Sequence, residues 1–248
     1  MRILVYQKIK SDRYMCGRFT LATTAEDLAQ QFGIEIDKPV ASRYNIAPSQ
    51  PIFSIRQNKT KKRILHVMQW GLIPSWVKDL NSWKSRASPL SSTQGRVARR
   101  IPRNLINARA ETVSEKPSFR GAFKYRPCLI PTSGFYEWTK ERQPYYYRLK
   151  ERSLFALAGL WESWSNGEDE LITCTIITTE ANEKAAKVHH RMPVIIQPQD
   201  YALWLGELDE RKQLLANLPE VNLDLYPVSK TVNSPQNDRP ECIEPINI

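Results

Sequence analysis

The stretch Met15-Cys16-Gly17-Arg18-Phe19 contains a cysteine whose chemistry depends on the state of its nitrogen. If every residue through Met15 is removed, Cys16 carries a free α-amine beside its thiol. Such a 1,2-aminothiol reacts with an aldehyde: the amine forms an imine, and the thiol then closes a five-membered thiazolidine in an intramolecular step. The α-amine, with a pKa of about 7.7–8.0, is partly unprotonated at neutral pH. A small buried cysteine in a first strand is the alternative, and these five residues alone favour it.

Later stretches place other reactive side chains among glycine, proline and aromatic residues. Asn107 and Arg109 are close together, and Glu137 is flanked by large rings that would raise its pKa and suit it to proton transfer. His189 precedes a proline turn and can titrate near neutral pH. Each has a structural alternative: Asn107 could satisfy a turn, Glu137 could pair with Lys140, and His189 could cap the helix before it.

The elements that must hold these side chains are mostly short strands. Alternating or β-branched segments predict strands at 16–21, 51–57, 63–69, 126–130, 135–139, 145–149, 154–160, 171–178 and 194–197. A helix should begin at Thr24, where Asp27 gives the spacing of a capping box, and end at Gly33. Shorter helices are expected at 118–123, 181–188, 200–205 and 209–215, and loops at 43–48, 70–76 and 189–193. This pattern favours one α+β domain with a mainly antiparallel sheet, twisted or barrel-like, and peripheral short helices.

Composition narrows the function classes. The 248 residues, 41% hydrophobic and 25% charged, fit a globular protein, and no apolar run approaches the roughly 20 residues of a membrane span. The four cysteines are far apart, so we expect no zinc site, no disulfide framework and a reducing cytosol. The net charge of +10, with seven tryptophans and ten tyrosines, favours single-stranded nucleic acid as a partner. A basic surface that only aids solubility is the alternative.

Six stretches, in this order, resemble the motifs of one family. They are Met-Cys-Gly-Arg-Phe at 15–19, Tyr-Asn-Ile-Ala-Pro at 44–48, Trp-Gly-Leu-Ile-Pro-Ser-Trp at 70–76, Ile-Asn-Ala-Arg-Ala-Glu-Thr at 106–112, Phe-Tyr-Glu-Trp at 135–138 and His-His-Arg-Met-Pro at 189–193. The chain is similar in these motifs to the SRAP proteins, the SOS-response-associated peptidases, which are also called abasic-site processing proteins. Six ordered motifs are far more specific than any one of them.

The resemblance implies a DNA-damage protein with autopeptidase activity. Self-cleavage would expose Cys16, which would crosslink as a thiazolidine to the ring-opened aldehyde of an abasic site in single-stranded DNA; a lyase activity at such sites is left open. The expected partner is single-stranded DNA containing abasic sites. No metal, other cofactor or membrane is implied, and we expect a cytoplasmic monomer that joins the nucleoid when bound to DNA.

The resemblance also implies catalytic roles. Cys16 would be the crosslinking nucleophile, and Asn107 would hold the sugar or the Cys16 backbone. Glu137 would shuttle protons, and His189 would protonate the opening sugar oxygen or assist reversal.

Five further residues would contact DNA. Arg18 and Arg109 would clamp phosphates with their planar guanidinium groups. Trp70 and Trp76 would form an aromatic wall near displaced bases, and Thr178 would line the same pocket.

Two segments depart from the family pattern. Residues 1–15 are expected to be a leader removed on maturation, or a start placed too far upstream, which leaves a domain at 16–248. If they stay attached, the Cys16 nitrogen is locked in a peptide bond and no thiazolidine can form. Residues 79–104 are expected to be a basic surface insertion; a solvated charge run is favoured there over a dedicated DNA contact.

Two other functions stay open. An N-terminal-nucleophile cysteine hydrolase could use Cys16, His189 and Asn107 as nucleophile, base and orienting group. A non-catalytic single-stranded DNA-binding module would use charge and aromatic rings alone, and its salt-sensitive binding would not need Cys16.

Overall fold

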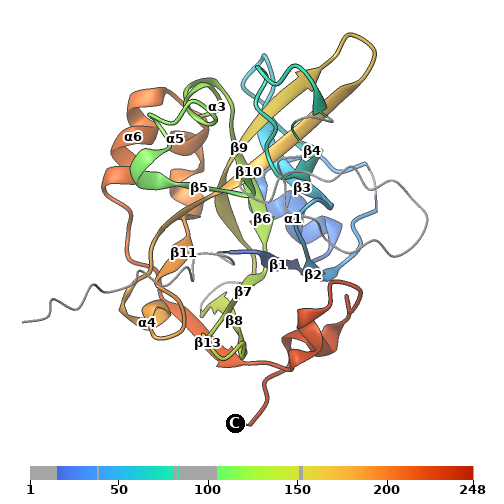
Figure 1. Cartoon of the computed structure of the whole chain (residues 1–248), viewed down its shortest axis with the longest axis vertical. Coiled ribbons are helices and arrows are strands. Elements are labelled where there is room, and N and C mark those ends of the chain that lie inside the picture. Colours follow the sequence, from blue (N-terminus) through green and yellow to red (C-terminus); the bar gives the residue numbers. More distant parts are fainter. Residues whose placement is uncertain (1–15, 38, 81–82, 84–104, 151–152, 248) are drawn as a thin grey trace, which may run out of the picture.

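The strands of the computed structural model form two sheets that lie one above the other in Figure 1. The model describes residues 16–37, 39–80, 83, 105–150 and 153–247. The lower sheet has five antiparallel strands in the order β13-β8-β7-β1-β2. Their bounds are Leu223–Pro227 for β13, Pro144–Leu149 for β8, Gly134–Trp138 for β7, Arg18–Leu21 for β1 and Arg43–Ile46 for β2.

The upper sheet closes on itself as a barrel. Each of five strands pairs with the next in the order β10-β4-β3-β6-β9, and β9 pairs with β10 to complete the ring. Their bounds are Glu170–Glu180 for β10, Arg63–Trp70 for β4, Pro51–Gln57 for β3, Pro127–Thr132 for β6 and Phe155–Ser165 for β9. All these pairings are antiparallel except that of β10 with β4, which is parallel. The predicted α+β class with a mainly antiparallel, barrel-like sheet is therefore confirmed.

Three short strands attach to the barrel and extend it toward the lower sheet. β5 (Asn107–Arg109) pairs in parallel with β10, and β11 (Arg191–Pro193) pairs antiparallel with β10. β12 (Ile195–Ile196) pairs with β9. Since β10 lies between β5 and β11, one strand brings together two segments that are about eighty residues apart in the chain.

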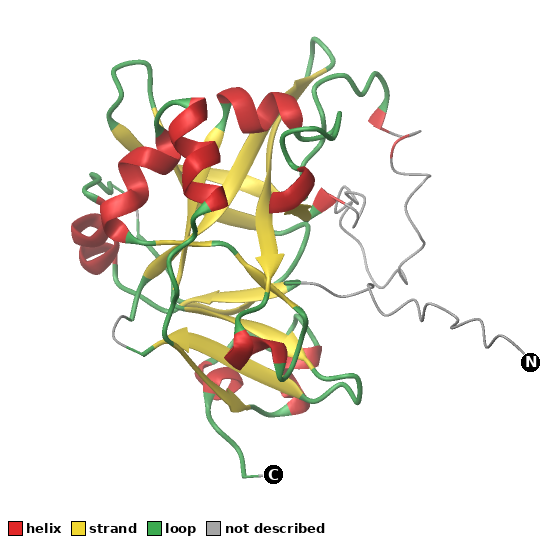
Figure 2. Ribbon diagram, turned by 90° about the vertical axis from the view of Figure 1, so that its left-hand side faces the viewer, coloured by secondary structure: helices red, strands yellow, loops and turns green. Residues whose placement is uncertain are grey.

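Short helices lie on the outside of the strands (Figure 2). They are α1 (Ala25–Phe32), α3 (Arg120–Tyr125), α4 (Glu183–Ala186), α5 (Tyr201–Leu205) and α6 (Leu208–Ala216), with 3₁₀ turns η3 (Ala110–Thr112), η4 (Pro198–Asp200), η5 (Lys230–Asn233) and η6 (Pro240–Ile243). The side chain of Thr24 accepts the Asp27 N–H at the start of α1, and Gly33 ends that helix in the left-handed region, as the sequence predicts. None of the described helices has the length and apolar character needed to cross a membrane.

One hydrophobic core joins the two sheets. Phe19 and Phe135 of the lower sheet belong to the same buried cluster as Ile55, Leu129 and Ala158 of the barrel. The shared core holds the seam between the sheets closed, and the candidate site described below lies at that seam.

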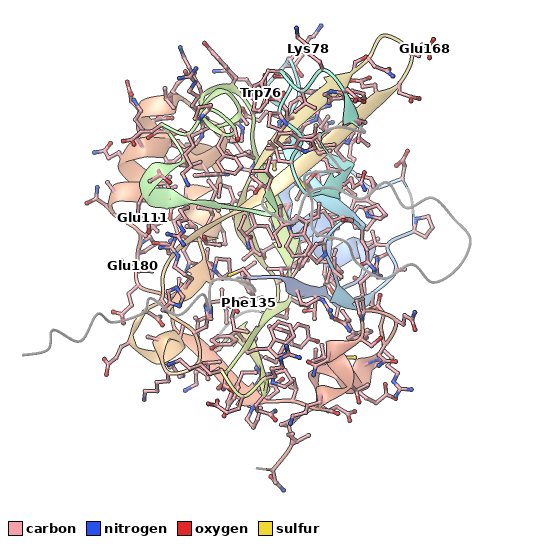
Figure 3. The ribbon with its side chains drawn as sticks, in the orientation of Figure 1. Trp76, Lys78, Glu111, Phe135, Glu168 and Glu180 are labelled. Atoms are coloured by element: carbon pink, nitrogen blue, oxygen red, sulfur yellow. The ribbon has the colours of Figure 1, made fainter. Side chains whose placement is uncertain are left out.

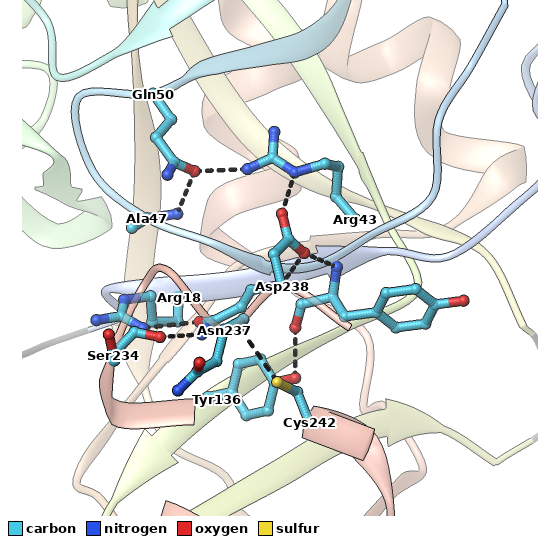
Figure 4. A network of polar contacts seen from close by, with 11 residues as sticks. Arg18, Arg43, Ala47, Gln50, Tyr136, Ser234, Asn237, Asp238 and Cys242 are labelled. Carbon is cyan, nitrogen blue, oxygen red and sulfur yellow. Dashed lines mark hydrogen bonds and ion pairs between the residues drawn. The ribbon is translucent and has the colours of Figure 1, made fainter. Parts of the chain in front are cut away.

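The C-terminal segment fastens the lower sheet through a polar network (Figure 4). The Asp238 carboxylate accepts hydrogen bonds from the backbone N–H groups of Tyr44 and Asn45, at 2.5 and 3.0 Å, and from the Arg43 guanidinium. The Asn45 amide donates toward the carbonyls of Val232, Ser234 and Asn237, at 3.0, 2.9 and 2.8 Å. Strand β2 is thus tied to residues almost two hundred positions later.

Three local predictions differ from the structure. Residues 43–46 and 191–193 are strands where loops were expected, because β1 and β10 each offer them a strand partner. The helix expected at 181–188 is limited to the four residues of α4. Residues 1–15 and most of the predicted 79–104 insertion lie outside the described residues.

Candidate active site around Cys16

The site lies where the two sheets meet. The lower sheet supplies Cys16, just before β1, and Glu137 from β7. The barrel side supplies Asn107 from β5 and His189 from the turn between α4 and β11. The fold therefore brings together all four residues that the sequence predicts to be catalytic.

Cys16 is buried and is held by both sheets. Its backbone N–H donates to Glu137 Oε1 at 2.7 Å, and its thiol also hydrogen-bonds with the Glu137 side chain. On the barrel side, Asn107 Nδ2 donates to the carbonyl of Cys16 at 3.5 Å. The backbone of Cys16 has a φ of 36°, a left-handed conformation that non-glycine residues rarely adopt. Nitrogen, thiol and carbonyl of one residue are thus each held by a side chain.

Glu137 is the carboxyl group at the centre of the site. It is 1% exposed, and this burial raises its pKa to about 8, although its hydrogen bonds with the Cys16 thiol and N–H act in the opposite direction. The sequence-based expectation of a raised pKa is confirmed. A carboxyl group that titrates near neutrality can both accept and donate a proton under ordinary conditions.

The Cys16 thiol and the Tyr147 phenol both resist ionisation. Burial raises the pKa of the Cys16 thiol well above its usual value, and the Glu137 carboxylate adds to this, while the positive charge of Arg191 lowers it. Burial also raises the pKa of Tyr147, with further contributions from Glu137 and Cys16. The thiol is therefore neutral in the folded protein, and a thiolate requires a proton acceptor beside it.

His189 lies next to the second carboxyl oxygen of Glu137, Oε2. Its Nδ1 is 3.9 Å from Glu137 Oε2 and 3.2 Å from both the backbone N and the backbone O of Arg191. When Nδ1 is unprotonated it accepts the Arg191 N–H, and when protonated it can donate to the Arg191 carbonyl. The ring can therefore gain or lose a proton at Nδ1 without leaving its place.

Arg191 is a component of the site that sequence reasoning passed over. It is 6% exposed, and its guanidinium donates to Glu111 Oε1 and Oε2 at 2.7 and 3.0 Å and to the carbonyl of Thr178 at 2.7 Å. Burial acts to raise the pKa of Glu111, but the hydrogen bonds and charge of Arg191 leave it below its usual value. The sequence signal that could have identified this pair is that Glu111 and Arg191 each lie in one of the six motifs.

The five predicted DNA contacts have different surroundings. The Arg18 guanidinium donates to Asn45 Oδ1 at 2.7 Å and to the carbonyls of Val232 and Asn233 at 2.7 and 3.1 Å, so it holds the C-terminal segment. Trp70 is fully buried and its Nε1–H donates to the Ile106 carbonyl, so its ring packs in the core instead of facing solvent.

The other three predicted DNA contacts lie elsewhere. Arg109 is exposed at the end of β5, and Thr178 is buried beneath Arg191. Trp76 is 55% exposed and meets Trp83 edge to face. Figure 3 shows Trp76 near Lys78 at the top of the view, well above Phe135 of β7.

Among the described residues, no group of three or more His, Cys, Asp or Glu side chains is suited to a metal ion. A surface hollow of about 200 Å³ is lined by Thr179 and Met192, which are paired across β10 and β11 on the face opposite Thr178.

Comparison with known proteins gives a consistent family assignment. Residues 15–235 match the family model described as SOS response associated peptidase (SRAP). The chain is 40% identical over 242 residues to "Abasic site processing protein YoqW" of Bacillus subtilis (strain 168), covering 93% of this chain and 99% of that protein. It is 30% identical over 239 residues to "Abasic site processing protein HMCES" of Gallus gallus, covering 83% and 66%.

Solved structures share the fold. A crystal structure of a protein from Bacteroides thetaiotaomicron matches with a TM-score of 0.73 at 24% identity, covering 94% of this chain and 100% of that chain. A phage-related protein from Bordetella bronchiseptica matches with a TM-score of 0.63 at 24% identity, covering 87% and 95%. At these identities the likeness concerns the fold alone.

Proposed function

The chain belongs to the SOS response associated peptidase (SRAP) family, and on that premise we propose that it processes abasic sites in single-stranded DNA by a covalent bond through Cys16. Relatives at 40% and 30% identity are named abasic site processing proteins, which supports the choice of lesion. The protein would act as a monomer on single-stranded DNA, without a metal or another cofactor.

The observation that carries the proposal is the position of one carboxyl group against both reactive atoms of Cys16. Glu137 Oε1 is 2.7 Å from the Cys16 nitrogen, and the same side chain hydrogen-bonds with the thiol. A hydrolase of the Cys–His type needs its base on the thiol alone. Thiazolidine formation needs proton transfer at the nitrogen and at the sulfur, so a shared carboxyl group fits it better.

The reaction begins with hydrolysis of the Met15–Cys16 peptide bond. One water is consumed, Met15 leaves with a carboxylate, and Cys16 gains an α-amine where the amide N–H now meets Glu137. Residues 1–15 therefore act as a leader in this proposal. Because the pKa of Glu137 is about 8, close to the pKa of about 7.7–8.0 of an α-amine, the ionised fraction of this side chain can take the proton of the new ammonium group.

Crosslinking follows in two steps. The amine adds to the C1′ aldehyde of the ring-opened sugar, and the resulting carbinolamine loses water to give an imine; protonated Glu137 supplies the proton that the departing hydroxyl needs. The thiol then adds to the imine carbon, its proton passes to the nitrogen, and a thiazolidine closes. One water is released overall. His189, 3.9 Å from Glu137, can receive or return the proton between steps.

The exposure of the five predicted side chains decides which of them would contact DNA directly. Arg109, at the end of β5, and Trp76 have exposed side chains that would contact phosphates and bases, and Thr178 of β10 pairs with Arg109. Arg18 acts indirectly, by fixing the start of β1. Trp70 acts through the core beneath the site.

Intact-protein mass tests the proposal. The full chain is mixed with a single-stranded oligonucleotide that has one abasic site, without any reductant. We expect the protein to lose residues 1–15 and to gain the mass of one oligonucleotide minus one water. Cys16→Ala should give no adduct, and Glu137→Gln should slow its formation by about 100-fold.

Matched substrates supply the controls. A tetrahydrofuran abasic analogue has no aldehyde, so it should bind without forming an adduct. Adduct formation that is equal in Cys16→Ala would overturn the proposal. Repeated turnover of a small amide substrate would instead establish the cysteine hydrolase, and lesion-independent binding without any adduct would establish the DNA-binding module.

A further inference from the structure

We infer that Tyr147 is a positioning residue for His189. Its phenol hydroxyl donates to the carbonyl of Ala185, and this carbonyl fixes the turn that presents the His189 ring to Glu137. The inference rests on the proposed function only for the reaction that this ring serves. The placement of the ring is a property of the DNA-free protein, so the two can fail separately.

The Tyr147 hydroxyl has a fixed place in the interior. Tyr147 is fully buried, and its ring stacks on that of Phe135, with centroids 4.8 Å apart and planes at 14°. The two residues are opposite one another in β8 and β7, so the stack follows from the pairing of the strands. The hydroxyl donates to the Ala185 carbonyl at 3.4 Å. Because a packed core ring keeps one rotamer, the strand pair dictates where this hydroxyl lies.

The Ala185 carbonyl is the acceptor on which the His189 turn closes. Besides the Tyr147 hydroxyl, it accepts the backbone N–H groups of Val188 and His189, at 3.0 and 3.1 Å. The N–H of Ala185 donates in turn to the side chain of Asn182 at 2.9 Å, so the peptide groups on both sides of Ala185 are held. The His189 backbone and the Tyr147 hydroxyl therefore share one acceptor atom.

Helix α4, which contains Ala185, depends on contacts with other elements. It has only four residues, and a helix this short is not stable by itself. It lies between β11 and β13 in Figure 1 and contacts both strands. The Lys184 side chain donates to the carbonyl of Leu223 in β13. Asn182 Nδ2 donates to the carbonyl of Val221, just before β13, at 3.2 Å. The helix that precedes β11 of the barrel is thus fastened to the lower sheet.

The same sheet carries Glu137. Glu137 in β7 is opposite Tyr145 in β8, two residues before Tyr147, so the side chains of Glu137 and Tyr147 are on one face. One pair of strands therefore holds the carboxyl group and, through the hydroxyl, the turn that carries His189. Together they set the 3.9 Å between His189 Nδ1 and Glu137 Oε2. A proton crosses this separation through one water or after a small movement, so the rate is sensitive to a shift of the turn.

The test compares two tyrosine variants. Tyr147→Phe removes only the hydroxyl, because phenylalanine keeps the ring that stacks on Phe135. Tyr145→Phe is the matched control, since it removes a phenol hydroxyl from a half-buried residue of the same strand. Each is made alone and together with His189→Ala, because a double-mutant cycle isolates the coupling between two residues. Crosslinking is followed against the concentration of abasic single-stranded DNA, which separates the first-order rate at saturation from the half-saturating concentration.

We expect Tyr147→Phe to lower the first-order rate by roughly 3- to 10-fold and to leave half-saturation within about 2-fold of wild type. In the His189→Ala background the same substitution should change the rate by less than about 2-fold, because the ring that it positions is gone. Tyr145→Phe should match its parent in both backgrounds. An equal effect of Tyr147→Phe with and without His189 would overturn the inference, and so would an unchanged rate in the single variant.

Proton NMR of the DNA-free protein tests the placement without any reaction. The chain has three histidines, so the ring signals of His66, His189 and His190 are few enough to assign. Tyr147→Phe should shift the His189 signals, and those of His190, whose ring centroid is 4.5 Å away, while His66 in β4 keeps its signals. Since the aromatic ring is retained at position 147, the shift reports the place of the imidazole.

The two readouts also separate this inference from the proposed function. Unchanged His189 signals in Tyr147→Phe would overturn the positioning role even if the wild-type protein crosslinks to the abasic site. Shifted His189 signals would support that role even if the wild-type protein forms no adduct and the proposed function has failed. Signals that shift equally in Tyr145→Phe would show a general response of β8 and would count against Tyr147.

Discussion

At the scale of single residues, the fold keeps the carboxyl group of Glu137 neutral at the expense of its own stability. The unfolded chain titrates this group near the usual pKa of about 4.3, whereas the folded protein holds the proton to about pH 8. Between these values the unfolded state has released a proton that the folded state keeps. The free energy of unfolding therefore falls as the pH rises through this interval and levels off above pH 8.

The direction of this pH dependence of the free energy of unfolding gives a prediction for Glu137→Gln. Glutamine has no proton to release, so the variant should lack this fall. We expect its free energy of unfolding, relative to wild type, to increase by roughly 3 kcal/mol between pH 5 and pH 8, because one pKa unit corresponds to about 1.4 kcal/mol. Urea unfolding at pH 5, 6, 7 and 8 measures the difference. Parallel curves for the two proteins would show that Glu137 titrates normally in the folded state.

Much of the site was predictable from residue types at this scale. Cys16, Asn107, Glu137 and His189 have side chains that carry recognisable chemistry, and the ordered motifs placed them together. Arg191 and Tyr147 were missed because their contribution depends on burial and on partners far away in the chain, such as Glu111. Trp70 was misjudged for the same reason: nothing in its motif distinguishes a ring packed in the core from a ring at the surface.

At the scale of elements, β7 can hold Glu137 in place only because it begins with a glycine. A Cβ atom at Gly134 would lie 2.3 Å from the Tyr146 ring and 2.5 Å from the Tyr147 carbonyl in the neighbouring strand. The carbonyl belongs to the backbone of β8 and cannot move aside without breaking the pairing. Strands β7 and β8 therefore approach one another more closely than a residue with a Cβ atom at position 134 would allow.

Gly134→Ala should consequently destabilise the protein by roughly 2–4 kcal/mol and reduce crosslinking in proportion to the unfolded fraction. Gly121→Ala is the matched control, since a Cβ there meets only the Arg126 side chain, at 3.8 Å, within a helix. It should be neutral or stabilise by up to about 1 kcal/mol. Thermal unfolding of both variants tests this prediction, and equal unfolding midpoints would contradict the steric clash at position 134.

The sequence predicted elements well where local signals suffice. The hairpin of β3 and β4 is marked by alternation on both sides of a basic turn, and α1 by its two caps. The strands β2 and β11 were expected to be loops, because their strand character comes from the partners β1 and β10. The parallel pairings of β10 with β4 and β5 have no local signature at all.

At the scale of the whole molecule, the two ends of the described chain stabilise each other. Asn45 links Arg18, through its Oδ1, to three carbonyls of the C-terminal segment, through its amide. Asn45→Ala leaves four polar groups without this partner and should cost roughly 2–4 kcal/mol. Because Arg18 is two residues from Cys16, crosslinking should also slow.

Limited proteolysis checks the prediction for Asn45→Ala. We expect faster cleavage within 229–247 than in wild type, together with a lower denaturant midpoint. Ser49→Ala is a suitable comparison, because Ser49 hydrogen-bonds through its backbone, with its N–H donating to the Trp70 carbonyl and its carbonyl accepting from the Gln69 amide. Resistance to proteolysis equal to that of wild type would mean that the Asp238 contacts alone hold the segment.

The meeting of the chain ends also bears on when the protein can become reactive during its synthesis. The ribosome makes Cys16 early, but Arg18 is fixed by carbonyls of Val232 and Asn233, which are made 214 and 215 residues after it. A nascent chain therefore has the cysteine long before it has the site around it. If that site removes the leader, residues 232 and 233 must be made first, so an aminothiol is released only after they have joined the fold.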